Sequence, residues 1–255
     1  MTASLLEVQN LCKSYGGVEA VQNVSLRMAA GEMLALIGPN GAGKSTCFGM
    51  LGGQIRPDRG RVCLNGADIT GLEPRALFRR GVGRTFQIAA IFGSMTVREN
   101  VELALSSHSA QARRPLGGFP AANRGEADRL VHAVGLAQLA ETSAGALSYG
   151  DVKRLELALA LCNGPCLLLM DEPTAGMGAT ERMDLMRLIG ALARESGIGI
   201  LFTEHDMDAV FAHADRILVL DRGRLIAEGT AQAIRADARV RRIYLGEGLT
   251  FSQEA

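Results

Sequence analysis

A glycine-rich run offers the clearest chemistry in this chain: Gly38, Pro39, Asn40, Gly41, Ala42, Gly43, Lys44, Ser45 and Thr46. Positions 38 to 45 fit the pattern G-x-x-x-x-G-K-[ST]. Glycines let successive backbone N–H groups turn inward around phosphate oxygens, and a helix N-terminus adds partial positive charge. Lys44 would neutralise those oxygens, and the Ser45 hydroxyl would be a ligand for Mg²⁺. The run predicts a nucleotide phosphate site; the alternative is a glycine-rich turn that happens to contain Lys-Ser.

Two adjacent carboxylates, Asp171 and Glu172, follow the apolar run Leu167–Met170. An acidic strand end places charge at the carboxyl edge of a sheet, where open α/β sheets bind ligands. We expect Asp171 to hold Mg²⁺ directly or through water, and Glu172 to polarise the water that attacks the γ-phosphorus. The alternative is two solvated acids at the end of a strand.

Strands and helices must position these groups. The apolar run Met33–Ile37 predicts a buried strand before the glycine-rich run, and Ser45–Gly52 a helix after it. Further strands are predicted at Leu5–Leu11, Val18–Met28, Arg61–Gly66, Leu167–Met170, Gly199–Thr203 and Ile217–Leu220, and helices at Glu126–Ala140, Leu155–Leu161 and Thr180–Ser196. Residues 106–125 lack a period and contain several breakers, so they predict a loop. The alternation of strands and helices indicates an α/β protein with a parallel sheet.

The composition excludes several classes of protein. The chain has 255 residues, 27 basic and 27 acidic side chains, and 47% hydrophobic residues, as in an ordinary globular protein. The neutral balance argues against bulk electrostatic binding to nucleic acid. No apolar run approaches the roughly 18–20 residues that cross a bilayer, and no signal peptide is visible. The five cysteines form no CxxC pair, so we expect buried thiols rather than a zinc site.

The run Leu147-Ser148-Tyr149-Gly150-Asp151 resembles the Leu-Ser-Gly-Gly-Gln signature of ATP-binding cassette (ABC) ATPases. The resemblance extends over essentially the whole chain. Tyr15 stands where that family stacks an aromatic ring on adenine, Gln87 matches the Q-loop, and His205 matches the switch histidine. Three departures are visible: Tyr149 replaces a signature glycine, Asp151 replaces the usual glutamine, and Gly178 stands where many members carry the D-loop aspartate.

Four other runs are similar to those of ATP-binding subunits of branched-chain amino-acid importers: Gly83–Ile88, Thr96–Val101, Glu172–Met177 and Tyr244–Glu247. The resemblance implies an α/β P-loop NTPase (RecA-like) core with an antiparallel β subdomain and an α-helical signature subdomain. It implies one nucleotide-binding domain, with the core at residues 1–87 and 163–236, the helical subdomain at 88–162 and a tail at 237–255.

The family pattern also implies roles for single residues. Two such domains meet head to tail, and Ser148 and the Gly150 N–H would donate to the γ-phosphate held by the partner. Tyr15 would stack on adenine, Gln87 would contact Mg²⁺ and water, and His205 would donate to the γ-phosphate. The alternatives are a serine N-cap, a strand tyrosine, a polar residue after a buried phenylalanine and a histidine at the edge of the core.

The expected reaction is hydrolysis of ATP to ADP and phosphate, coupled to solute translocation. The resemblance implies integral membrane permease subunits, a second cassette or a homodimer partner, and indirectly a periplasmic solute-binding protein, with no nucleic acid. It places the chain in the cytoplasm, peripheral on the inner membrane, in an importer of branched-chain amino acids or related small polar solutes. The rivals are the ATPase subunit of a lipid or lipopolysaccharide exporter and a soluble ABC ATPase outside transport.

Overall fold

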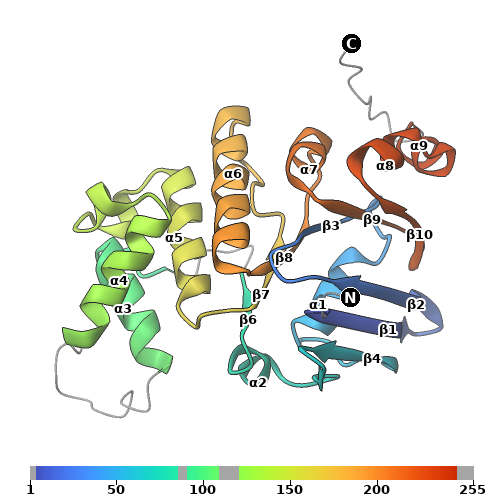
Figure 1. Cartoon of the computed structure of the whole chain (residues 1–255), viewed down its shortest axis with the longest axis horizontal. Coiled ribbons are helices and arrows are strands. Elements are labelled where there is room, and N and C mark those ends of the chain that lie inside the picture. Colours follow the sequence, from blue (N-terminus) through green and yellow to red (C-terminus); the bar gives the residue numbers. More distant parts are fainter. Residues whose placement is uncertain (1–3, 86–90, 109–120, 246–255) are drawn as a thin grey trace.

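A computed structural model describes residues 4–85, 91–108 and 121–245 of the chain. Its larger sheet has six strands in the order β10-β9-β3-β8-β7-β6 (Figure 1). The strands are β3 (Met33–Ile37), β6 (Val82–Arg84), β7 (Leu167–Asp171), β8 (Gly199–Thr203), β9 (Arg216–Asp221) and β10 (Arg224–Gly229).

The prediction of a parallel sheet is confirmed for five strands and wrong for the sixth. Strands β6, β7, β8, β3 and β9 pair in parallel, whereas β10 pairs antiparallel with β9. Arg222 and Gly223 join β9 to β10 with φ angles of 45° and 78°. Positive φ at both central residues is typical of a tight hairpin turn, usually built from Asn-Gly or Asp-Gly. Because Arg222 occupies the first of these positions in place of Asn or Asp, the sequence gives no signal for this turn.

The smaller sheet is antiparallel, as predicted, with strand order β2-β1-β4-β5. It consists of β1 (Leu6–Tyr15), β2 (Val18–Met28), β4 (Arg59–Leu64) and β5 (Ala67–Asp68). Strand β2 has the predicted bounds. Strand β1 continues past the predicted end at Leu11, because it pairs with β2 as far as Tyr15.

The described helices include nine α-helices and two short 3₁₀ turns. They are α1 (Lys44–Leu51), α2 (Pro74–Phe78), α3 (Val97–His108), α4 (Ala121–Ala133), α5 (Tyr149–Leu161), α6 (Ala179–Ser196), α7 (Met207–His213), α8 (Ala231–Ala236), α9 (Ala238–Leu245), η1 (Ala137–Leu139) and η2 (Ala144–Ala146). Figure 1 shows α3, α4 and α5 as a group beside α6, away from the antiparallel sheet.

One loop prediction and two helix predictions were wrong in extent, and the helix predicted at Leu155–Leu161 begins earlier, at Tyr149. The loop predicted at 106–125 overlaps helix at both ends, since α3 runs to His108 and α4 begins at Ala121; residues 109–120 lie outside the described part. The helix predicted over 126–140 ends at Ala133, because Gly135 takes φ 76° and a 3₁₀ turn follows. A left-handed glycine after the last turn is a common way for helices to end.

The six-stranded sheet separates two apolar clusters. Met33, Ala35 and Ile37 of β3 face the cluster that contains residues of α5, α6 and α7. Leu34 and Leu36 face the other cluster, which contains residues of α1 and of the antiparallel sheet. Side chains alternate between the two faces of a strand, so burial on both faces explains the unbroken apolar run. The glycine-rich run therefore begins directly after a strand that is buried on both faces.

The five cysteines are free thiols. Cys12 and Cys47 are buried as predicted, whereas Cys63, Cys162 and Cys166 are partly exposed, so that prediction was wrong for three of them. Within residues 4–85, 91–108 and 121–245, no helix has the length and apolar character to cross a membrane.

Candidate functional site

The glycine-rich run links the end of β3 to the start of α1. Gly38 and Gly43 have φ angles of 154° and 103°. A Cβ on Gly38 would lie 2.2 Å from the Leu220 carbonyl oxygen, and one on Gly43 would lie 2.4 Å from the Ala20 carbonyl oxygen. A positive φ and a close backbone neighbour therefore both require glycine at these two positions. The sequence pattern thus reflects a loop pressed against β2 and β9.

The first turn of α1 presents positive charge and a hydroxyl group. Lys44 is 9% exposed, and its Nζ donates to the carbonyl oxygens of Gly38 at 2.6 Å and Pro39 at 3.1 Å. Ser45 is exposed and Thr46 is half-buried. The helix has no side-chain cap and no acidic residue in its first turn. A helix N-terminus without acidic compensation attracts anions, so this end of α1 suits phosphate.

Asp171 ends β7 directly opposite Thr203, the last residue of β8. The Thr203 hydroxyl donates to Asp171 Oδ1 at 2.7 Å, and Arg84 Nη2 lies 3.9 Å from Asp171 Oδ2. Burial lowers the pKa of Arg84, and the charge of Asp171 opposes that shift. Asp171 is thus held in one orientation by two neighbouring strands.

Glu172 adopts a strained backbone conformation with φ 51°. Its N–H donates to both the carbonyl and the hydroxyl oxygen of Thr203, each at 3.1 Å. A non-glycine residue in this region costs about 1–3 kcal/mol and persists only where its surroundings fix it, often at functional sites. Here the two hydrogen bonds to Thr203 hold the Glu172 backbone in this conformation.

The structure brings Glu172 and His205 together. Glu172 Oε1 lies 2.8 Å from His205 Nε2, and the two side chains are 28% and 55% exposed. The sequence predicted both residues but gave them separate partners. A carboxylate accepts only, so with Glu172 ionised the imidazole carries its hydrogen on Nε2. The pair is accessible to water and lies at the ends of adjacent strands.

The sequence interpretation missed Thr203 and Glu204, the two residues that precede His205. Thr203 is 1% exposed and Glu204 is 5% exposed. The available signal was a polar residue at the end of a continuously buried strand and another directly after it, because buried polar groups need partners.

The signature run begins helix α5. Ser148 is the N-cap: its hydroxyl oxygen accepts from the Asp151 N–H at 3.2 Å, and the hydroxyl donates to Asp151 Oδ2 at 2.7 Å. The alternative interpretation of Ser148 as a helix cap is therefore correct, and it is compatible with a binding role. Asp151, which departs from the family glutamine, is the residue that completes this cap. Gly150 is buried and Tyr149 is half exposed.

Tyr15 lies at the end of β1, in the hairpin that leads to Ala20 and its contact with the loop. Its side chain is 48% exposed, and the Lys13 ammonium lies 5.5 Å from the ring centroid. Exposure near the loop suits stacking on a base, which stays a prediction. Gln87 lies outside the described residues.

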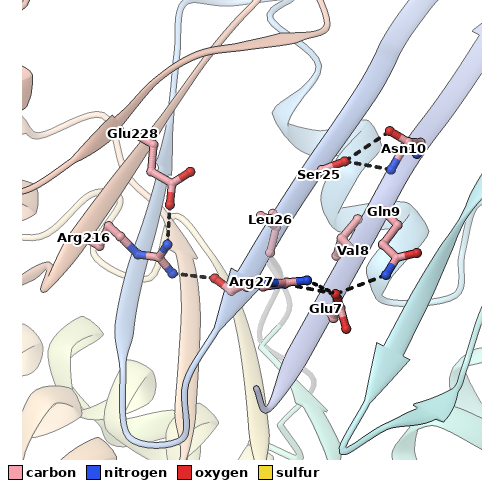
Figure 2. Close-up of a pocket in the computed structure, with 9 residues that line it drawn as sticks. All are labelled: Glu7, Val8, Gln9, Asn10, Ser25, Leu26, Arg27, Arg216 and Glu228. Atoms are coloured by element: carbon pink, nitrogen blue, oxygen red, sulfur yellow. Dashed lines mark hydrogen bonds and ion pairs between the residues drawn. The ribbon is translucent and has the colours of Figure 1, made fainter. Parts of the chain in front are cut away.

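A groove of about 480 Å³ lies elsewhere, on the antiparallel sheet and β9–β10 (Figure 2). Its charged side chains pair with one another: Arg27 with Glu7, and Arg216 with Glu228. Arg216 also donates to the Arg27 carbonyl oxygen, which joins the two sheets. The groove is thus a cross-linked junction between the sheets, and it includes no residue of the glycine-rich run.

Two family models match this chain, one over more than half of its length and one near its C-terminus. The family model described as ABC transporter matches residues 21–175. The model described as branched-chain amino acid ATP-binding cassette transporter matches residues 224–250. The first match includes the glycine-rich run, the signature and both strand-end carboxylates.

Curated relatives cover nearly the whole chain. The high-affinity branched-chain amino acid transport ATP-binding protein BraF of Pseudomonas aeruginosa is 38% identical, over 97% of this chain and 100% of its own length. LivG of Escherichia coli K12, described in the same words, is 38% identical with the same coverage. The lipopolysaccharide export system ATP-binding protein LptB of the same strain is 37% identical, over 95% of this chain and 97% of its own.

Solved structures agree with the fold. The ADP conformation of an ATP-binding cassette of an ABC transporter has a TM-score of 0.86 and 31% identity, over 95% of this chain and 99% of that one. A dimeric cassette in a post-hydrolysis state, bound to ADP and Pi, has a TM-score of 0.73 and 27% identity, over 89% of this chain and 98% of that one.

Proposed function

Because this chain belongs to the ABC transporter family of ATP-binding cassettes, we propose that it hydrolyses ATP to energise solute import across a membrane. The P-loop ATPase fold predicted from the sequence is confirmed by the solved cassettes. We also propose the domain division that the family resemblance implies, with the core at 1–87 and 163–236, the helical subdomain at 88–162 and the tail at 237–255. One observation supports ATP hydrolysis most directly. The water-accessible Glu172–His205 pair follows β7 and β8, in the same sheet whose strand β3 leads into the glycine-rich loop and the uncapped N-terminus of α1.

The ATP phosphates would lie over residues 38–46. Left-handed glycines and the open N-terminus of α1 would supply N–H groups, and the buried Lys44 ammonium would supply positive charge. That ammonium is now held by two loop carbonyls, so it is already aimed into the loop. Tyr15 would bind the adenine ring through its exposed face.

The oxygen-bearing side chains at this site fit Mg²⁺. The described residues contain no group of three or more His, Cys, Asp or Glu side chains that could hold a metal ion by themselves. Mg²⁺ is commonly bound by one or two protein oxygens, several waters and substrate phosphates. Ser45 and Asp171 offer such oxygens, and Gln87 would contribute a third. The ion would neutralise charge on the phosphates.

Glu172 would orient and deprotonate the attacking water. His205 binds one oxygen of the carboxylate, which leaves the other available to a water molecule. The strained backbone and the two hydrogen bonds from its N–H to Thr203 fix the direction of the side chain. Because His205 Nε2 lies against Glu172, a γ-phosphate would compete for its hydrogen, and His205 would then donate to the phosphate in place of Glu172.

Each ATP would be enclosed by a second cassette, either another copy of this chain or a related subunit. The capped N-terminus of α5 would present Ser148 and the Gly150 N–H to the γ-phosphate bound by that partner. Pairing of two cassettes is supported by related cassettes that were solved as dimers. Closure of the pair on ATP and release after hydrolysis would drive transport as a population shift.

The import role rests on the relatives and on the C-terminal match at 224–250. The solute would be a branched-chain amino acid or a related small polar molecule, chosen by permease subunits and by a periplasmic solute-binding protein. The chain would sit on the cytoplasmic face of the inner membrane, bound to those permeases. Lipopolysaccharide export is the second candidate, because LptB is nearly as similar as LivG.

Reconstitution tests the two roles. The chain is co-expressed with candidate permease subunits and a second cassette and placed in vesicles, with Lys44→Ala as the inactive control. Import predicts ATP-dependent leucine uptake that Lys44→Ala abolishes. ATP-dependent extraction of lipopolysaccharide without uptake of any amino acid would favour the exporter instead.

A further inference from the structure

Glu204 carries no role in the site described so far, although it is the residue before His205 and is 5% exposed. Both of its carboxylate oxygens are occupied. Oε1 accepts from the Thr174 N–H at 2.8 Å and from the Thr174 hydroxyl at 2.6 Å, and Oε2 accepts from the His205 N–H at 3.3 Å. A buried carboxylate costs much free energy unless such donors satisfy it.

These bonds join two segments that each carry one member of the hydrolytic pair. Thr174 belongs to the loop 172–177, which begins with Glu172, while the backbone of His205 follows β8. Thr174 is 1% exposed, so the connection is shielded from water. A shielded hydrogen bond to a charged acceptor is among the stronger kinds in proteins.

A second connection, through Arg182, joins the same two segments. Arg182 of α6 donates to the Met177 carbonyl oxygen at 3.2 Å and forms an ion pair with Asp206. The loop 172–177 is therefore tied to segment 203–206 at Thr174 and again at Met177. Its outer side is tied to the signature, where the Tyr149 hydroxyl donates to the Ala175 carbonyl oxygen at 2.9 Å.

We propose that Glu204 is a positioning residue for the Glu172–His205 pair. Its carboxylate holds loop 172–177 against the His205 backbone, so that Glu172 Oε1 and His205 Nε2 meet at hydrogen-bonding distance. The Tyr149–Ala175 bond fixes the same loop to α5, so the signature and the hydrolytic pair share one anchored segment. This inference rests on the proposed function, in which Glu172 acts on the attacking water.

The first test replaces the carboxylate by its amide. Glu204→Gln keeps the shape but turns one acceptor into a donor, which then faces the N–H of Thr174 or of His205. We expect kcat for ATP to fall about tenfold or more while KM changes less than about twofold, because the phosphate loop is untouched. Asp208→Asn, which removes an exposed acid on neighbouring α7, is the matched control and should leave both constants unchanged.

A second pair of variants guards against simple misfolding. Thr174→Val removes the hydroxyl that donates to Glu204 and keeps the shape of the side chain, whereas Thr174→Ser keeps the hydroxyl. We expect Thr174→Val to lower kcat, whereas the kcat of Thr174→Ser should stay within about twofold of the wild type. Equal activity of Thr174→Val and Thr174→Ser would overturn the proposal even if Glu204→Gln did not fold.

Epistasis separates positioning from general stability. In a Glu172→Gln background, Glu204→Gln should cause no further loss of the residual hydrolysis, because residues that act as a unit are not additive. Fully additive losses, or a wild-type kcat for Glu204→Gln beside an inactive Glu172→Gln, would overturn the positioning role alone. A wild-type rate for Glu172→Gln would instead overturn the proposed function on which the inference rests.

Discussion

Thr203→Val removes one hydroxyl from the centre of the site and keeps the size of the side chain. That hydroxyl donates to Asp171 Oδ1 at 2.7 Å and accepts from the Glu172 N–H at 3.1 Å. Thr203 is 1% exposed and the Asp171 side chain only 12% exposed, so water has little access to replace the lost partner. The substitution therefore removes the hydroxyl partner of Asp171 and one of the two hydrogen bonds of the Glu172 N–H, which keeps its bond to the Thr203 carbonyl oxygen.

The magnitude follows from the bond to the carboxylate. A hydrogen bond to a charged group contributes about 1.5–3 kcal/mol to stability. In a domain of this size each kcal/mol corresponds to about 2–4 °C in Tm, so Thr203→Val should lower Tm by about 3–12 °C. Losing the fixed direction of Asp171, a cost of about 1.4 kcal/mol, should raise the Mg²⁺ concentration for half-maximal ATPase activity about tenfold.

Thr203→Ser is the matched control, since it keeps the hydroxyl and removes one methyl group. The two variants are compared by thermal unfolding and by ATPase activity at saturating ATP over a Mg²⁺ titration. Thr203→Ser should follow the wild type in Mg²⁺ dependence and lose only about 0.5–1.5 kcal/mol of stability. Identical Mg²⁺ curves for Thr203→Val, Thr203→Ser and wild type would refute the idea that Thr203 orients Asp171.

Three further predictions concern residues around the site. Tyr15→Ala should raise the ATP concentration for half-maximal activity several-fold, consistent with about 1 kcal/mol of stacking, while Tyr15→Phe is tolerated; equal effects would make Tyr15 a strand residue only. Burial raises the pKa of Cys47 to about 12, so this thiol should stay neutral and resist N-ethylmaleimide at pH 8 until the protein is denatured, as read by mass spectrometry. Lys153 and Glu156 form an ion pair with side chains 8% exposed, so Lys153→Met should destabilise the fold by about 3–5 kcal/mol in denaturant titrations, and adding Glu156→Leu should recover most of that loss.

The sequence predicted those features of the fold that depend on short stretches of the chain, namely the bounds of two strands and the positions of two loop glycines. Strands β2 and β3 have the bounds expected from alternation and from an unbroken apolar run. Gly38 and Gly43 lie where the phosphate-loop pattern requires them, and their left-handed φ angles supply the reason. These features depend on backbone conformation and burial, which short stretches of sequence record.

Contacts between distant segments account for what was missed. Helix α4 begins inside the predicted loop, and Asn123 Nδ2 donates to the Ser106 hydroxyl of α3 at 2.9 Å. The Glu172–His205 pair depends on the register of β7 against β8. Nothing near either residue in the chain records that register, so their separate roles could be predicted and their contact could not.

Glu172→Gln tests the central claim most directly, because it keeps the size and the hydrogen-bonding capacity of the side chain and removes the base. ATP hydrolysis by the purified chain is measured. Its oligomeric size in ATP and Mg²⁺ is determined by chromatography or scattering, first alone and then mixed with a second cassette subunit. Glu195→Gln, an exposed acid at the end of α6, is the control. We expect hydrolysis to fall about 10²-fold or more while ATP binding survives and an ATP-bound pair accumulates. Hydrolysis at the wild-type rate would contradict the assignment of Glu172 as the base, and its loss without ATP-dependent pairing in either mixture would contradict the shared site at Ser148 and Gly150.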